Sequence, residues 1–186
     1  AGSPPLLPIG EAEHLYVLNV YLGCIWGSVR LKMPPAMLDT SGLGWRVEFR
    51  TMEAQPSDRE NAALCTFVVL LTQALLLQSA NQANWLIPMT LSHENMRRAC
   101  LRDAIRTQRF YWITNNGGGV AEMTAAEIFL GSDRCRGLLP LVKQHLLQHG
   151  NGMHPRLASY LELIEGRATG RLPTPAAWMR QFCEAH

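Results

Sequence analysis

The stretch from residue 45 to residue 53 constrains this chain more than any other segment. Its sequence, WRVEFRTME, alternates charged and apolar side chains with the period of two that is typical of a half-buried β-strand. Arg46, Glu48 and Arg50 therefore share one face, and the apolar side chains share the other. The strand is predicted to place a carboxylate between two guanidinium groups.

Two interpretations of that charged face remain open on the residues alone. The first is a solvated sheet face with cross-strand ion pairs, each of which contributes only about 0–1 kcal/mol. The second is a binding site, because arginine pairs with phosphate or carboxylate oxygens through two hydrogen bonds and carboxylates are ligands for magnesium. A face that presents both groups is suited to phosphoryl transfer.

A second short strand is predicted upstream of this one. Residues 28–33 also alternate and are followed by Pro34, so Arg30 and Lys32 would share one face. The prolines of residues 1–12 predict a flexible tail or linker. The remaining length, residues 13–186, is typical of one domain.

The helices are predicted mainly from their ends. Capping boxes at Ser57-x-x-Glu60 and Thr124-x-x-Glu127 should begin helices that end near residue 78 and at Gly131. The other expected helices run from Ser92 to about 107, from 138 to 149, from 155 to 164 with a stop at Gly166, and from 175 to 184 after Thr174. The predicted fold class is α+β, mostly helical with early antiparallel strands.

Composition argues against several function classes. The net charge is +2 and the 17 basic residues are dispersed, so nucleic-acid binding is not expected. The apolar stretches 15–29 and 62–77 are shorter than the roughly 20 residues of a membrane span. The five cysteines are widely spaced and lack a C-x-x-C pair, which predicts neither a disulfide framework nor a zinc site.

Two smaller groups are candidate sites. Arg102 and Asp103 are expected to form a structural ion pair with each other. His145 and His149 share a helix face without a third ligand nearby in sequence, which favours a solvated face over a metal site.

The segment GWRVEFRTMEAQ, residues 44–55, resembles the signature of glutamate–cysteine ligases, ATP-dependent enzymes that make γ-glutamylcysteine for glutathione. Residues 26–35, WGSVRLKMPP, resemble the strand that precedes this signature in the family. Further blocks follow in the family's order at residues 58–62, 67–72, 87–88, 94–96, 102–104, 110–111, 137–142, 160–164, 167–170 and 178–182. The resemblance covers residues 26–186.

The resemblance implies a portion of a glutamine synthetase-like carboxylate–amine ligase fold and a two-step reaction. ATP phosphorylates the γ-carboxylate of L-glutamate, and the amine of L-cysteine then displaces phosphate. By resemblance, Glu48 is a Mg²⁺ ligand and Arg50 a catalytic contact to ATP phosphate. Arg46 would bind ATP or substrate, or orient Glu48. Glu53 and Gln55 would contact substrate unless they belong to a turn or cap. The expected location is the cytoplasm, with an organelle as the alternative.

Three departures from the family pattern bear on activity. Thr51 stands where the family has a proline, and residues 114–119 replace a longer family insertion. Family members are also several times longer, and their N-terminal part supplies most of the acidic metal ligands. The chain is therefore expected to act only with a complementing N-terminal portion. The alternative is a non-catalytic, ligase-derived structural subunit of a larger assembly, for example in an organelle.

Overall fold

The computed structural model describes residues 10, 16–17, 20, 29–32, 44–77, 86–115, 119–149 and 153–185. The chain divides into two compact units, Ala1–Ala54 and Gln55–His186, and each is considered by itself. Apart from Gly10, the predicted tail lies outside the described residues, as do Pro34 and the central glycines of the 114–119 loop.

The first unit contains the two early strands that the sequence predicts. β1 (Val29–Lys32) and β2 (Arg46–Phe49) pair antiparallel, with Arg30 opposite Glu48 and Lys32 opposite Arg46. β2 is shorter than the predicted strand of residues 45–53, while residues 28 and 33 at the ends of the other predicted strand lie outside the described residues. β2 ends at Phe49, which pairs with Val29. Alternation marks the residues that can form a strand, but the length of the strand depends on how many of them pair with a neighbouring strand.

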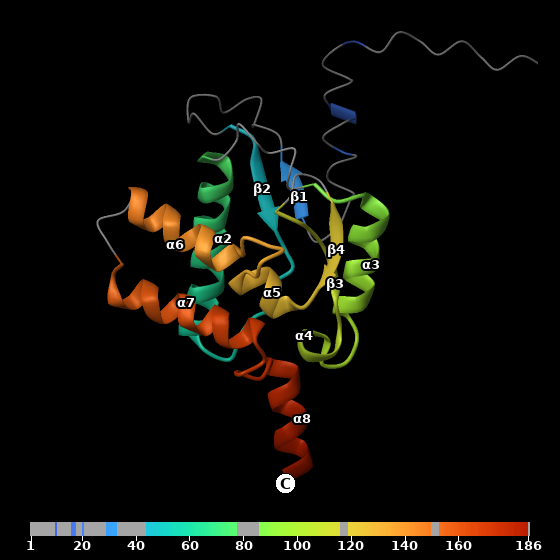
Figure 1. Ribbon diagram of the computed structural model, residues 1–186, viewed down its shortest axis with the longest axis vertical. Helices are drawn as coiled ribbons and strands as arrows, with labels where there is room; N and C mark the ends of the chain where they lie inside the picture. The colour runs from blue at the N-terminus through green and yellow to red at the C-terminus, as the bar shows by residue number, and fades with distance from the viewer. Residues whose placement is uncertain are drawn as a thin grey trace, which may run out of the picture. The chain divides into compact units, whose positions relative to one another are not determined.

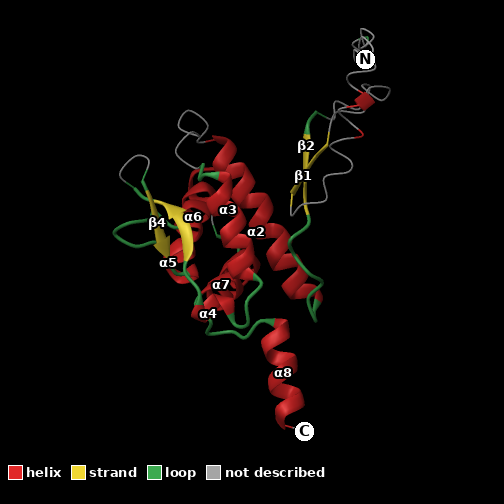
Figure 2. Ribbon diagram, turned by 90° about the vertical axis from the view of Figure 1, so that its right-hand side faces the viewer, coloured by secondary structure: helices red, strands yellow, loops and turns green. Residues whose placement is uncertain are grey.

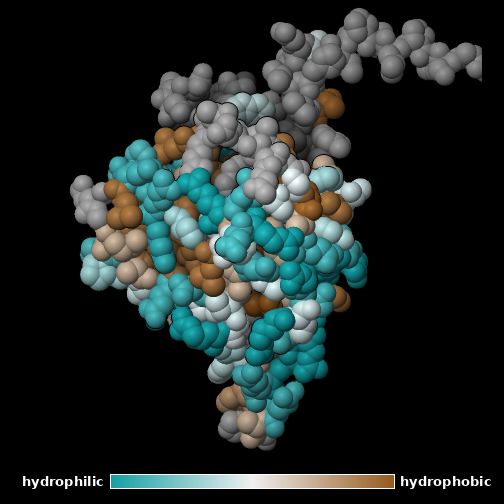
Figure 3. All heavy atoms as spheres, viewed as in Figure 1, coloured by the Kyte–Doolittle hydropathy of each residue, from teal (hydrophilic) through white to brown (hydrophobic). Residues whose placement is uncertain are grey.

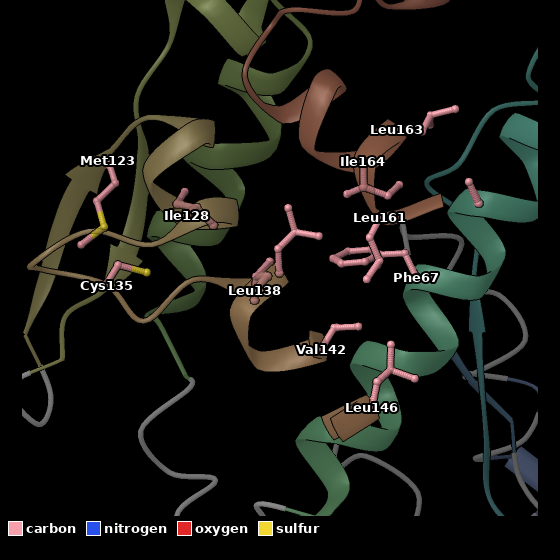
Figure 4. Close-up of a cluster of buried hydrophobic side chains, with 12 residues drawn as sticks. Phe67, Met123, Ile128, Cys135, Leu138, Val142, Leu146, Leu161, Leu163 and Ile164 are labelled. Carbon is pink, nitrogen blue, oxygen red and sulfur yellow. The ribbon is translucent and has the colours of Figure 1, made fainter. Parts of the chain in front are cut away.

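Three helices enclose the core of the second unit: α2 (Asp58–Leu77), α6 (Leu138–His149) and α7 (Pro155–Ala168). α2 packs against both of the others, and the short α5 (Ala125–Leu130) packs against α6 and α7 (Figure 1). Figure 4 shows Phe67 of α2 pointing toward Leu138 of α6 and Leu161 of α7. Phe67 also stacks on Phe129, with ring centroids 5.8 Å apart.

By length and composition alone, α2 is also the one helix of the described residues that could cross a membrane. It turns Ala63, Phe67 and Ala74 inward, where they are buried. A core helix of a globular protein can have the same composition, and α2 packs on α6 and α7, with 17% of its apolar window buried.

The predicted helix from Ser92 to residue 107 is wrong. α3 (Met89–Ala99) begins after Pro88, so Ser92 lies inside its first turn, and a separate helix, α4, spans Ala104–Thr107. Asp103 interrupts the path with a φ of 55°, a left-handed conformation that no α-helix contains.

A second hairpin, formed by β3 (Phe110–Ile113) and β4 (Val120–Met123), is not predicted from the sequence. The residues of β3 do not alternate, so the period of two is absent. Asn95 of α3 binds the backbone of Tyr111 twice: its Oδ1 accepts from N at 2.7 Å, and its Nδ2 donates to O at 2.9 Å. Tertiary contact therefore orders this region.

The predicted capping box at Thr124 is complete, and at Ser57 the side chain caps the helix as predicted while Glu60 bonds to the Ser57 hydroxyl. Glu60 N donates to Ser57 Oγ at 3.3 Å at the start of α2. At α5, Glu127 N donates to Thr124 Oγ1 at 3.2 Å and Thr124 N donates to Glu127 Oε2 at 2.7 Å. Both helices begin where the sequence predicts.

The predicted stop of α7 at Gly166 is also wrong, because the helix continues to Ala168. Gly166 is buried inside α7, and a Cβ at this position would meet Leu172 Cδ1 at 2.7 Å. Its role is close packing rather than termination. The left-handed residue after the helix is Gly170, with a φ of 72°.

The last helix, α8 (Pro175–Ala185), begins as predicted, with Ala177 N donating to Thr174 Oγ1 at 3.2 Å. Figures 1 and 2 show α8 extending away from the other helices of its unit. Trp178 and Phe182 stack on each other and remain about half exposed. Apolar side chains also reach the surface at this tip in Figure 3.

Candidate functional site

The β1–β2 ribbon has one charged face, built by strand register. Since side chains alternate along each strand, the pairs Arg30–Glu48 and Lys32–Arg46 lie on the same face. Arg50 follows Glu48 by two residues and bonds to it from just beyond β2. The two strands thus bring together cationic groups of β1 and β2 that are 14 or more residues apart in sequence.

Each oxygen of the Glu48 carboxylate contacts a different cation. Arg50 Nε donates to Oε1 at 2.7 Å, and Lys32 Nζ lies 2.7 Å from Oε2. The sequence predicts a carboxylate between two arginines of the same strand. The structure instead shows Glu48 between Arg50 and a lysine of the neighbouring strand.

These contacts control the ionisation of Glu48. The Lys32 ammonium and then the Arg50 guanidinium lower the pKa of Glu48 below its ordinary value, because both stabilise the carboxylate anion. Glu48 is therefore negatively charged throughout the neutral pH range.

Arg30 sits directly across from Glu48 and was not assigned a role from the sequence. Its Nε is buried and has no hydrogen-bond acceptor within the part of the chain that the structure describes. The alternation of residues 28–33 does place Arg30 and Lys32 on one face. Only the register of β1 on β2 shows that this face is the one that carries Glu48.

Glu53 and Gln55 follow β2. Glu53 is exposed, past the end of the strand. Gln55 is fastened to the first turn of α2, since its N donates to Asn61 Oδ1 at 3.0 Å and its O accepts from Asn61 Nδ2 at 3.1 Å. The backbone of Gln55 therefore forms a turn, which was one of the two interpretations of this residue.

The donor set of the charged face fits phosphate better than a lone metal ion. Magnesium needs near-octahedral oxygen coordination, and it is commonly held by one or two carboxylates, waters and substrate phosphates. Glu48 is a single carboxylate beside Lys32, Arg50 and Arg30. The face therefore fits a magnesium ion only when phosphate oxygens accompany it. Among the residues described, no cluster of three or more His, Cys, Asp or Glu side chains could hold a metal.

Two hollows lined by described residues of the second unit differ in character from the charged face. One, of about 410 Å³, has an almost entirely apolar lining from α3, β3 and α5, including Met96, Trp112 and Phe129. The other, of about 240 Å³, is lined by Trp178, three prolines and the ion pair of Arg167 with Glu60. Neither hollow combines a nucleophile with an acid or base, so neither indicates a reaction.

The ion pairs of the second unit stabilise the fold. Arg98 Nε donates to Glu94 at 2.8 Å, while its Nη1 donates to Glu122 at 2.8 Å. The predicted pair between Arg102 and Asp103 is wrong, since Asp103 pairs with Arg106 at 2.9 Å and Arg102 lies 3.7 Å from Glu184. Side chains of adjacent residues do not face each other on a helix, whereas those three residues apart do.

His145 and His149 lie on one face of α6, with ring centroids 5.2 Å apart. His145 is partly buried and His149 is exposed. Among the described residues no third ligand lies beside them.

Comparisons with known proteins place these observations in a family. The sequence model of the glutamate–cysteine ligase family matches residues 14–186. Glutamate–cysteine ligase of Schizosaccharomyces pombe is 36% identical over 175 residues, which cover 87% of this chain and 25% of that protein. The glutamate–cysteine ligase catalytic subunit of Homo sapiens is 36% identical over 185 residues, covering 87% of this chain and 28% of the relative.

The chain thus spans about a quarter of the length of the curated relatives that it matches. No solved structure gives a significant match. The family match includes the β1–β2 ribbon and all the described helices from α2 to α8. This chain belongs to the glutamate–cysteine ligase family.

Proposed function

We propose that this chain is the C-terminal portion of an ATP-dependent glutamate–cysteine ligase and that the β1–β2 face is one wall of its active site. Residues 13–186 would form the C-terminal part of the catalytic domain, a portion of a glutamine synthetase-like fold, and residues 1–12 a tail or linker. The observation that carries the proposal is the ionised Glu48 surrounded by cations within the family's signature.

The roles follow from the chemistry of the groups. Arg50 is proposed to contact the transferring phosphoryl group, because a guanidinium stabilises charge that develops on phosphate oxygens. Arg46 would bind ATP or orient Glu48. Glu53, at the exposed end of the strand, would contact substrate.

Glu48 is proposed as one oxygen ligand of Mg²⁺, which would neutralise phosphate charge when ATP is bound. Phosphate, water and carboxylates from a complementing N-terminal portion of the enzyme would complete the coordination. With ATP, L-glutamate and L-cysteine as substrates, the product is γ-glutamylcysteine, formed through γ-glutamyl phosphate in the cytoplasm. The pathway served is glutathione biosynthesis.

A chimeric enzyme tests this function. In the S. pombe relative, the matching 25% of the protein is replaced by this chain, and ATP-dependent formation of γ-glutamylcysteine is measured. Glu48→Gln keeps the shape of the side chain but removes its charge, and it should lower kcat by at least about 100-fold, the scale of losing a group that stabilises the transition state. The matched control is Glu162→Gln, on an exposed position of α7.

Near wild-type activity of the Glu48→Gln chimera would contradict the role of Glu48 as a metal ligand.

One specific observation favours the alternative, a structural subunit without activity. Both oxygens of Glu48 are already held by cations, as in a purely structural ion-pair network. A folded chimera that assembles but forms no product, even with Glu48 intact, would support that alternative.

A further inference from the structure

We propose that the apolar hollow of about 410 Å³ beside α3, β3 and α5 binds a small, neutral and largely apolar molecule that carries one hydrogen-bond acceptor, such as an aryl ketone. The acceptor pairs with the indole N–H of Trp112. The described residues that line the hollow all belong to the second unit. This site is therefore separate from the charged face of the β1–β2 ribbon and does not depend on the function proposed for that face.

The size and the lining of the hollow define the chemistry of its ligand. The volume lies within the range of roughly 300–1,000 Å³ that is usual for small-molecule sites. None of the described residues that line it is ionisable, and three of them are aromatic: Phe110, Trp112 and Phe129. A charged ligand would lose its hydration there without gaining a counter-ion, so a neutral ligand with a flat apolar body fits best.

Trp112 decides which polar group the ligand carries. Phe110 and Trp112 are two residues apart on β3, so their side chains share one face of the hairpin, and both line the hollow. The Nε1 atom of Trp112 is buried and has no acceptor within the part of the chain that the structure describes. An indole nitrogen only donates, and a buried donor without an acceptor costs free energy. A ligand oxygen that accepts from Nε1 recovers this cost.

The hollow has firm walls and one adaptable side chain. Asn95 is held by its two hydrogen bonds to the backbone of Tyr111, and Phe129 is held by its stacking on Phe67. Met96 also lines the hollow and is 43% exposed. Because Nε1 is enclosed, a ligand reaches it only when the lining moves slightly. The unbranched methionine side chain can make that movement at little cost.

A matched pair of probes tests the site. Acetophenone has an aromatic ring and one carbonyl, and α-methylstyrene has the same shape with CH₂ in place of the oxygen. Both are titrated into the ¹⁵N-labelled chain and followed by NMR. Acetophenone should move the Hε1 resonance of Trp112 downfield, because the indole gains an acceptor. It should also bind about fivefold more tightly than α-methylstyrene, the scale of one neutral hydrogen bond.

Two variants separate the hydrogen bond from the space. Trp112→Phe keeps an apolar ring, assigns the Hε1 resonance by its loss, and should bind the two probes with affinities within about twofold of each other. Ala99→Leu adds a larger side chain at an exposed position of the lining and should weaken both probes by about tenfold. Ala158→Leu makes the same change on the exposed surface of α7 and should leave both affinities unchanged. Circular dichroism establishes that each variant is folded.

Two results in the isolated chain would overturn the proposal. If neither probe shifts any resonance at about 1 mM, where even a weak site is partly filled, the hollow does not take ligands of this class. If acetophenone and α-methylstyrene bind equally tightly to the wild-type chain, Trp112 does not pair with an acceptor.

The chimera with the S. pombe relative decides whether the hollow belongs to a ligand or to the rest of the enzyme. Saturation-transfer difference NMR should still detect bound acetophenone in the chimera, and Ala99→Leu should weaken that signal. Absence of the signal in the unsubstituted chimera would show that another part of the ligase covers the hollow, and the small-molecule site would be refuted. None of these results changes the test of Glu48, which measures product formation.

Discussion

Lys32 Nζ lies 2.7 Å from Glu48 Oε2, although Lys32 is paired in register with Arg46. The contact is diagonal across the ribbon, which the long lysine side chain permits. Because it joins two strands, it links the orientation of Glu48 to the presence of β1. The carboxylate in the family signature thus depends on a residue 16 positions upstream.

Glu94 should make the stability of the second unit depend on pH. Arg97, and then Arg98, lower the pKa of Glu94 to about 2 through hydrogen bonds to its carboxylate. Since the folded pKa lies below the unfolded value, this stabilisation is complete above about pH 4.5 and is lost as the pH falls toward 2. The free energy of unfolding in urea, measured at pH 6, 4 and 3, should fall more for the wild type than for Glu94→Gln. Equal pH dependence in the two proteins would contradict this assignment.

Gly166→Ala should destabilise the second unit by about 1–3 kcal/mol, because the added Cβ would lie 2.7 Å from Leu172 Cδ1 and 2.8 Å from its Cγ, so the Leu172 side chain must shift. Gly44→Ala is the control, since nothing lies within 4 Å of a Cβ at that position. Urea unfolding of both variants measures the difference. An unchanged stability of Gly166→Ala would show that the close approach to Leu172 is not required.

Phe67→Ala should lower the free energy of unfolding by about 3–5 kcal/mol, since it removes a buried ring at the meeting point of α2, α6 and α7 (Figure 4). Phe182→Ala removes the same ring from an exposed position of α8 and should cost less than about 1 kcal/mol. Differential scanning calorimetry compares the two. A similar loss of unfolding free energy in both variants would show that the exposed ring of α8 contributes as much to stability as the buried ring of α2.

Much of the local structure could be predicted from the sequence because it depends on residues within one or two turns. The start of α5 follows from Thr124 and Glu127, which bond to each other across three positions. The charged face of β2 follows from alternation, and the α+β class from the number of helices beside two early strands. The family resemblance was also visible in the sequence, and the family model matches residues 14–186.

Other features could be found only in the tertiary structure. α3 ends before Asp103, which has a left-handed conformation. β3 lies against α3, because Asn95 of α3 binds the backbone of Tyr111. Gly166 is a packing position rather than a helix stop, since Leu172 approaches it from the following loop.

The same division applies to the candidate site. The sequence by itself determined that Arg46, Glu48 and Arg50 share a face, because the period of a strand is a property of the local backbone. Only the tertiary structure decided that Lys32 completes the ion pairs of Glu48 and that Arg30 stands opposite it. The register of β1 on β2 brings together residues that are far apart in sequence, and no periodic pattern in the sequence marks them as neighbours. Register is set by the pairing of the two strands and not by either strand alone.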